Sequence, residues 1–495
     1  MNLTSGTLST AGLISGTSLS TISSEINVIS RNISNANTAG YATRTANLVT
    51  GPSGSAEIAS ILRATNPELF RSQLQATSGN AQASALSSGI DQIAQFLSLS
   101  NSTVGASSPS AYISKFEKAL QQYDSSPSDS TVAGTVVTAA KDLTNSLNQA
   151  TTLVQGVRQS ADTQIGASVS SINSILGQFQ QVNTAIVSGT GAGQDVSDLQ
   201  EQRDQLLNQL SSQIGISTVT RANNDTVILT DSGVTLFETT PRSVTFSPTA
   251  TLSPGQSGNA VYVDGVQVTG QGAAAPLQSG QIVGLTQLRD TVAPQYQSQL
   301  DEVARGLVSA FAETDQTGGG ASPMPGLFTF PGATGVPGAT VVPGLAGQIQ
   351  INAKADPSQG GNASLIRDGG IAGSAYTYNK TGASLYTGRI EQLLSSLSAP
   401  QSFDASTGLG ASVSVKSFAA SSDGWLASQQ QGADNAATYQ SALLSQSSQA
   451  LSNTVGVNLD SQMSKMLDLE NSYQATAKLM STIDSMYTTL FNAIK

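Results

Sequence analysis

The longest regular pattern in the 495 residues is an apolar repeat between positions 136 and 186. Apolar residues recur there at alternating steps of four and three, which places them along one side of an α-helix. As one helix this segment would be about 75 Å long, at about 1.5 Å per residue. It predicts a long rod with bending or a break at Gly156, Gly166 and Gly177, because glycine weakens a helix interior. The repeat consists of Val136, Ala140, Leu143, Leu147, Ala150, Val154, Val157, Ala161, Ser168, Ile172, Ile175, Phe179, Val182 and Ile186.

Both ends of the chain carry a similar apolar stripe. The N-terminal stripe ends at residues 35–40, where Asn and Gly favour the left-handed conformation that stops helices. The C-terminal stripe continues to the last turn, so something must cover it. We therefore predict that the terminal segments pair as a coiled coil. The stripe residues are Leu19, Ile22, Ile26, Ile29 and Ile33 at one end, and Leu459, Met463, Met466, Tyr473, Met480, Tyr487, Leu490 and Ile494 at the other.

The middle of the chain changes its period. Ser197 with Gln200 has the spacing of a capping box and predicts the start of a helix. From residue 216 to about 269 the period becomes two, with strands predicted at 226–230, 244–246 and 261–263. Residues 317–345 are rich in Gly and Pro and indicate a loop.

These patterns predict a mainly α fold with a smaller β-rich part, elongated and nested, in which the terminal helices pair. The expected domains are a terminal helical coiled-coil domain (1–60 and 440–495), a helical body (61–215, 280–316 and 366–439), a β-rich segment (216–279), and a Gly/Pro-rich loop with a small outer β segment (317–365).

Composition excludes many kinds of site. The chain has no His and no Cys, so it cannot form a Ser-His or Cys-His nucleophile pair. It also lacks the usual ligands of zinc, haem, copper and iron–sulfur clusters. The net charge of −11 disfavours nucleic-acid binding. No apolar segment is long enough to insert into a membrane. We expect no enzymatic activity, no cofactor and no metal.

Two local features suggest ligands but have simpler explanations. The glycines at 189–193 lack the Gly-Lys-Ser/Thr ending of a phosphate loop. Asp195, Asp198, Glu201 and Asp204 do not have the spacing of a calcium loop, and acidic residues stabilise the start of a helix.

One motif is more specific than these patterns. Asn32, Asn35, Thr38, Gly40 and Tyr41 form an Asn-x-x-Asn-x-x-Thr-x-Gly-Tyr sequence, followed by Arg44. It resembles the N-terminal signature of the flagellar rod, hook and hook-associated axial proteins. The segments 456–460 and 473–478 are similar to the C-terminal end of the same family, and 198–206 and 280–315 to its hook-associated members.

The resemblance implies a structural subunit that joins the flagellar hook to the filament. Its copies would form a ring and contact hook protein, a second junction protein (hook-associated protein 3) and an export chaperone. Subunits of the family leave the cell unfolded, without cleavage, through the flagellar type III channel. The terminal stripes, with Asn35, Thr38, Gly40 and Tyr41, would then form the assembly interface.

Other interpretations stay open from the sequence. The N-terminal stripe could belong to an ordinary intramolecular core helix, and Gly40-Tyr41 could be only a helix cap with a packed aromatic ring. The chain could also be a hook or distal rod subunit, or, outside the family, a secreted adhesin or a type III translocator.

Overall fold

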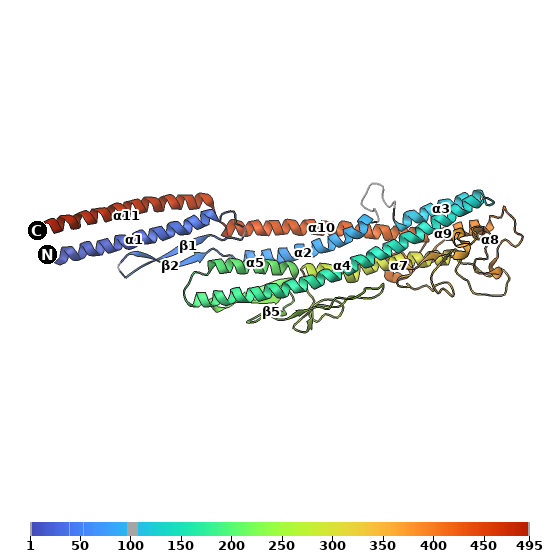
Figure 1. The fold of residues 1–495 in the computed structure, drawn as a ribbon, viewed down its shortest axis with the longest axis horizontal. Coiled ribbons are helices and arrows are strands. Elements are labelled where there is room, and N and C mark those ends of the chain that lie inside the picture. Colours follow the sequence, from blue (N-terminus) through green and yellow to red (C-terminus); the bar gives the residue numbers. More distant parts are fainter. Residues whose placement is uncertain (1, 39, 53, 97–106, 494–495) are drawn as a thin grey trace.

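The computed structural model describes residues 2–38, 40–52, 54–96 and 107–493. It is an elongated molecule with both termini at the same end (Figure 1). We call that end the arm; it comprises residues 2–63 and 459–493. The body comprises residues 67–455. The predicted mainly α, elongated and nested fold is confirmed.

The body is built along one helix, α4, which runs from Ser130 to Gly191. The side chain of Asp129 caps its start by accepting hydrogen bonds from the backbone N–H groups of Thr131 and Val132. Every residue of the predicted apolar repeat is buried. The helix continues through all three glycines without a break. Burial of the apolar side outweighs the cost of about 1 kcal/mol that each glycine adds.

The other helices of the body pack around α4 (Figure 1). Helix α6 passes through a π-helical turn, Leu288–Val292, into α7, and Pro294 lies in the first turn of α7, where a missing N–H is tolerated. The helices are α2 (Pro67–Phe96), α3 (Pro109–Ser125), α5 (Ser197–Gln213), α6 (Gln281–Gln287), α7 (Ala293–Ala310), α8 (Leu365–Asp368), α9 (Gly388–Ser398) and α10 (Val415–Val455).

The strands of the body form small antiparallel sheets beside the helices. The order is β3-β4-β5 in one sheet and β6-β7-β8 in the next, and the pairs β9-β10 and β11-β12 lie further along the chain. Asp264 and Gly265 both have positive φ, as a two-residue hairpin turn requires. The strands are β3 (Ile216–Thr220), β4 (Thr226–Thr230), β5 (Thr235–Phe237), β6 (Val244–Thr245), β7 (Tyr262–Val263), β8 (Val266–Gln267), β9 (Phe328–Thr329), β10 (Gln350–Ile351), β11 (Gln401–Ser402) and β12 (Ser412–Val413).

The capping box predicted at Ser197 and Gln200 is wrong. Ser197 is the first residue of α5, and its backbone N–H and hydroxyl both donate to Asp195 Oδ1, at 3.0 and 2.6 Å. Asp195 therefore takes the role expected of Ser197, because its carboxylate reaches the first free N–H of the helix.

The arm consists of helices α1 (Asn2–Ser34) and α11 (Leu459–Ala493), with a β-hairpin formed by β1 (Arg44–Thr50) and β2 (Ala56–Arg63). Figure 1 shows α11 and α1 side by side, with the hairpin along the other side of α1. The hairpin was not predicted. It reaches Arg63, and α10 runs unbroken to Val455, so these elements cross the divisions expected at 60 and 440.

Candidate functional site

The contact between α1 and α11 follows a seven-residue repeat. Gln462 and Ile483 of α11 are buried against α1, and Leu469, Thr476 and Leu490 of the same repeat are half-buried. Glycines of α1 allow close approach: added side-chain carbons at Gly12 and Gly16 would lie 3.8 Å from Ile483 and Met480. The terminal helices therefore pair, but mainly through residues three positions further along α11 than Met466, Tyr473 and Met480 of the predicted stripe.

The predicted interface residues differ in how deeply the pairing of α1 with α11 buries them. On α1, Ile29 is buried, and Leu19, Ile22, Ile26 and Ile33 are half-buried. On α11, Met466, Tyr487 and Leu490 are half-buried, whereas Leu459, Met463, Tyr473 and Met480 are exposed. In the turn after α1, Asn35 and Tyr41 are half-buried, and Thr38 and Gly40 are exposed. Ile494 lies outside the described residues.

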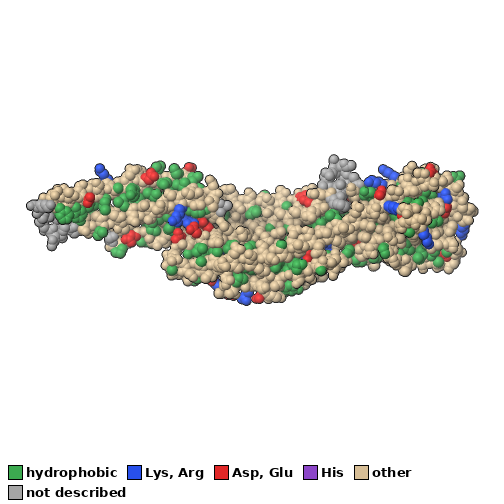
Figure 2. Space-filling view, viewed as in Figure 1, with side chains coloured by type: hydrophobic (Ala, Val, Ile, Leu, Met, Phe, Trp, Pro, Cys, Tyr) green, Lys and Arg blue, Asp and Glu red, His purple; other side chains and the backbone are tan. Residues whose placement is uncertain are grey.

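Much of the apolar surface of α11 is not covered by the residues that the structure describes. Met463, Leu467 and Phe491 keep 51%, 58% and 65% of their surface exposed. Figure 2 shows hydrophobic side chains along much of the arm. We call the exposed apolar residues of this helix the α11 flank: Leu459, Met463, Leu467, Tyr473, Leu479, Met480, Met486 and Phe491.

Asn32, the first residue of the Asn-x-x-Asn-x-x-Thr-x-Gly-Tyr motif, is the centre of a buried hydrogen-bond network at the base of the arm. Asn32 is fully buried, and its amide donates to Arg44 O at 2.8 Å and to Gln462 Oε1 at 2.9 Å. Its Oδ1 accepts hydrogen bonds from the Tyr41 hydroxyl at 2.9 Å and from the Arg44 backbone N–H at 3.0 Å. One side chain therefore ties α1 to the hairpin, to the turn and to α11.

The turn between α1 and β1 is held by local hydrogen bonds. Thr38 donates to Asn35 through both its backbone N–H and its hydroxyl, and the Tyr41 N–H donates to Thr38 O. Gly40 has a φ of 81°, the left-handed conformation that favours glycine. The Tyr41 ring lies under the Arg44 guanidinium, 5.0 Å away, and burial raises the pKa of Tyr41. All these contacts lie within one chain; a contact of Tyr41 with a neighbouring subunit stays a prediction.

The hairpin is attached to the body by ion pairs with α5. Arg44 pairs with Asp198 and, at 3.1 Å, with Glu201, while Arg63 Nη2 lies 2.7 Å from Asp204. The Arg44 side chain is only 3% exposed. Burial opposes its charge, but the hydrogen bonds to Asp198 and Glu201 outweigh that effect and raise the pKa of Arg44.

Sequence reasoning missed this part of the site. It attributed Asp198, Glu201 and Asp204 to the start of a helix and assigned no role to Arg63 or Gln462. The signal was the three-residue spacing of the acids, which places them on one face of α5. Without the hairpin, nothing in the sequence connected that face to the arginines.

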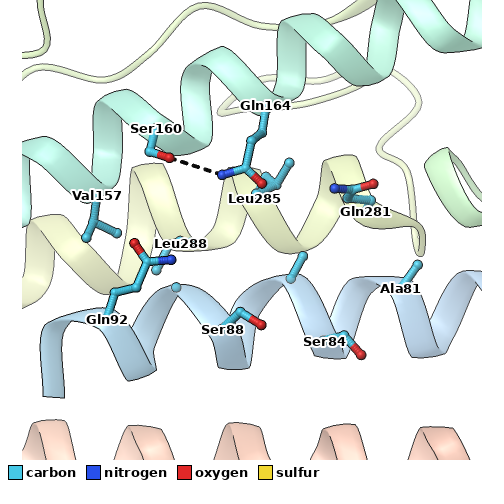
Figure 3. A pocket seen from close by; sticks show the side chains of 12 residues that line it. Ala81, Ser84, Ser88, Gln92, Val157, Ser160, Gln164, Gln281, Leu285 and Leu288 are labelled. Atoms are coloured by element: carbon cyan, nitrogen blue, oxygen red, sulfur yellow. Dashed lines mark hydrogen bonds between the residues drawn. The ribbon is translucent and has the colours of Figure 1, made fainter. Parts of the chain in front are cut away.

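The body carries a shallow groove of about 320 Å³ between α2, α4 and α6 (Figure 3). Its lining is made of small or neutral side chains, such as Ser84, Ser88 and Gln92, and Gln164 donates to the Ser160 hydroxyl at 3.1 Å. No carboxylate lines it, so it offers no general acid and base. Within the described residues there is no group of three or more acidic side chains fit to hold a metal, and no helix is both long and apolar enough to cross a membrane.

Two family models match this chain. The model described as the flagellar hook-associated protein FlgK helical domain matches residues 90–329. The model described as the flagellar basal body rod FlgEFG protein C-terminal matches residues 448–493. The first match covers α3 to α7 and includes α5, which binds the hairpin. The second covers the end of α10 and all of α11.

Individual proteins match over part of the chain. Flagellar hook-associated protein 1 of Salmonella typhimurium is 25% identical over 297 residues, which are 58% of this chain and 53% of the relative. That of Escherichia coli K12 is 26% identical over 305 residues, or 59% and 54%. The chain thus spans about half the length of these curated relatives. The solved structure of the flagellar hook junction protein FlgK from Burkholderia pseudomallei is 23% identical, with a TM-score of 0.40, covering 52% of this chain and 46% of that one.

The two family models fall on the helical body and on the C-terminal helix. The body includes 198–206 and 280–315, the segments whose patterns resembled hook-associated proteins. The hook-associated helical-domain model covers just under half of the chain. Over its helical body the chain is similar to the flagellar hook-associated protein 1 family.

Proposed function

We propose that this chain is a structural subunit of the bacterial flagellum that joins hook to filament. The observation that supports this role best is the α11 flank. A helix that is apolar on more than one side is normally buried on more than one side. Helix α1 covers one side of α11, so the uncovered side requires a further partner, and neighbouring copies of the arm supply the same kind of surface.

The flank is large enough to drive association. Burial of one large apolar side chain stabilises a complex by roughly 1.5–3 kcal/mol before the cost of association. Single exposed apolar residues are common on monomers and need no partner. Eight of them on one helix form more apolar surface than such scattered residues do. In the assembled state the arms would form the inner wall of a ring, with α1 and α11 as a coiled coil. The turn of Asn35, Thr38, Gly40 and Tyr41 would lie at the edge of that wall.

The partners follow from this role. The ring of copies would contact hook protein on one side and hook-associated protein 3 on the other. An export chaperone would cover the terminal stripes before export through the type III channel. The site of action would be outside the cell, at the hook–filament junction. The role is mechanical, and the absence of His and Cys agrees with it.

A hook or distal rod subunit is the second candidate, because the model that matches α11 describes the C-terminal part of a flagellar basal body rod protein. The long helical body, which matches the hook-associated helical domain, favours the junction role over this alternative. An adhesin or a translocator has no comparable support.

Deletion of the gene tests the assignment. We expect cells with hooks, flagellin secreted into the medium, and no filaments, because the first filament subunits would have no ring to build on. Electron microscopy of the cell surface and immunoblots of the medium measure these outcomes. Normal filaments in the deletion strain would exclude the junction role, and loss of the hooks would favour the rod alternative.

A further inference from the structure

The joint between arm and body lacks a continuous apolar core. The core of the body includes residues from Leu74 on α2 to Ala433 on α10. Among the described residues, the buried apolar side chains of the arm, namely Val28, Ile29, Ala42 and Ile483, are not part of it. The arm is therefore packed as a separate unit. Polar contacts hold such a joint, and a joint of this kind permits relative motion.

The covalent connections across the joint are short. Residues 64–66 link β2 to α2, and residues 456–458 link α10 to α11. Thr43 holds both links: its N–H donates to Val455 O at 2.8 Å, its hydroxyl to Gly456 O at 2.7 Å, and its carbonyl accepts from Ala64 N. These contacts lie close together, so they define a pivot. A pivot alone does not fix the angle of the arm.

The ion pairs with α5 are a second set of contacts between arm and body. Arg44 and Arg63 are directly opposite each other in the hairpin. Asp198, Glu201 and Asp204 follow at intervals of three along α5, so that the two guanidinium groups lie between three carboxylates. Glu201 is shared: one oxygen is 3.1 Å from Arg44 Nη2 and the other 4.0 Å from Arg63 Nε.

The ion pairs leave donors and acceptors available for a second arrangement. The Nε atoms of Arg44 and Arg63 are buried and have no hydrogen-bond partner among the residues that the structure describes. At the outer end of the row, Asp198 is 83% exposed although it pairs with Arg44. Three carboxylates serve two cations. Each arginine can therefore change its carboxylate partner along α5 without becoming unpaired. The free-energy cost of an unpaired buried charge is then avoided.

We propose that Arg44 and Arg63 with Asp198, Glu201 and Asp204 form an ionic latch that sets the angle between arm and body. Opening or re-pairing of the latch turns the arm about the Thr43 pivot. Such a hinge is a recognised way for a small local change to move a domain. Its use in assembly rests on the proposed function: a subunit between hook and filament meets two different lattices, and a latch with more than one pairing lets the same arm fit both.

The latch is tested on the isolated 495-residue chain by distance measurement between two spin labels. The protein has no cysteine, so Ser23→Cys on α1 and Ser188→Cys on α4, both at exposed positions, provide unique labelling sites. We expect one narrow distance distribution at low salt. Arg63→Glu should shift and broaden it, and the exchange Arg63→Glu with Asp204→Lys should narrow it again. Rescue by exchanged charges is not expected of a residue that acts only through packing.

The matched control is Arg71→Gln, which removes the exposed ion pair with Glu68 on α2 and should leave the distribution unchanged. If Arg63→Glu loses helical circular dichroism, Arg63→Gln replaces it, since it removes only the charge. If the distance distribution of the Arg63 variant keeps the wild-type distance and width, the latch is overturned. The same holds if the distribution of the exchange variant is no narrower than that of Arg63→Glu. Assembly is not involved, so failure of the junction assignment in the deletion strain leaves this result unaffected.

Discussion

At the residue scale, some buried polar side chains are held by several hydrogen-bond partners at once. Asn32 uses its two donors and its acceptor oxygen inside the arm. In the body, Arg289 pairs with Asp162 at 2.6 Å and with Asp290, and its Nη2 also donates to Asn259 O at 2.8 Å. A buried polar group that is fully hydrogen-bonded costs little, but removing one partner leaves the others unsatisfied. Such residues are therefore the sensitive points of the molecule.

Replacement of Asn32 by Ala should loosen the base of the arm. The change removes the partners of the Tyr41 hydroxyl, the Arg44 N–H and Gln462 Oε1, each at a cost of about 1–3 kcal/mol. Amide hydrogen exchange should become faster in residues 28–44 and 459–466, with little change in α4. Asn35→Ala is the control, because the hydrogen bonds of Asn35 are exposed and local. Equal exchange rates in both variants would contradict the buried role of Asn32.

Asp301 should make the stability of the body depend on pH in an unusual direction. It is fully buried and accepts hydrogen bonds from Gly344 N at 2.8 Å and Ala346 N at 2.9 Å. Burial raises the pKa of Asp301 from 3.8 to about 6. Between these values the folded protein binds more protons than the unfolded chain. The contribution of Asp301 to stability is therefore present below pH 4 and lost as the pH rises through 6.

Urea unfolding of wild type and Asp301→Asn from pH 4 to 7 measures this effect. The difference in free energy of unfolding between the two should change by up to about 3 kcal/mol across the window, at 1.36 kcal/mol per pKa unit. Asp315→Asn serves as the control. Hydrogen bonds from Thr317 lower the pKa of Asp315 to about 2, so its contribution changes only below pH 4. Parallel curves for wild type and Asp301→Asn would show that the pKa of Asp301 is not raised.

At the scale of elements, α4 illustrates how packing overrides local preference. Gly156 and Gly177 lie on its open side, where an added side-chain carbon would meet nothing within 4 Å. Glycine thus costs helix stability there without serving a contact. Gly284 of α6 is different, because an added carbon would lie 2.3 Å from the backbone oxygen of Gln82. It allows α6 to approach α2 closely.

Substitutions of these glycines by Ala should have opposite effects. Gly177→Ala should stabilise the body by about 0.4–1 kcal/mol, because it reduces the freedom of the unfolded chain. Gly284→Ala should destabilise it by about 1–3 kcal/mol, since α2 or α6 must move. Chemical unfolding followed by circular dichroism compares them. A stabilising Gly284→Ala would mean that α2 and α6 do not pack at this distance.

At the scale of the whole molecule, two kinds of surface are separated along the rod. The body covers its apolar core, whereas the arm exposes the α11 flank (Figure 2). Removal of residues 456–495 should therefore leave a soluble body that no longer assembles. A milder test keeps the arm and changes only its surface.

Met463→Gln combined with Leu467→Gln should abolish filaments when it replaces wild type in the deletion strain. Both side chains are exposed, so the melting temperature of the purified chain should stay within a few degrees of wild type, as surface changes rarely exceed about 0.5 kcal/mol. The control is Leu385→Gln, an exposed leucine of the body, which should leave filaments intact. The number of filaments per cell is counted by electron microscopy. A wild-type number of filaments with the double variant would argue against the α11 flank as an interface.

The sequence alone determined the parts of this protein that depend on one repeating signal. Local structure is predicted by the heptad of α4, by the stripes of α1 and α11 and by the Asn-x-x-Asn-x-x-Thr-x-Gly-Tyr motif. Each works because helix periodicity and turn chemistry act over a few neighbouring residues. The motif, with the segments 198–206, 280–315, 456–460 and 473–478, also pointed to the flagellar axial proteins, and both family models describe flagellar proteins.

The tertiary structure decided what depends on residues far apart in the chain. It showed that Asn32 bonds to Gln462, that the acidic face of α5 holds the hairpin, and that α1 covers the side of α11 beside the expected stripe. Periodicity states how wide an apolar stripe is, but not which part of it the partner helix covers. Ion pairs between residues 44 and 198 carry no local signal, since only the fold brings the hairpin to α5.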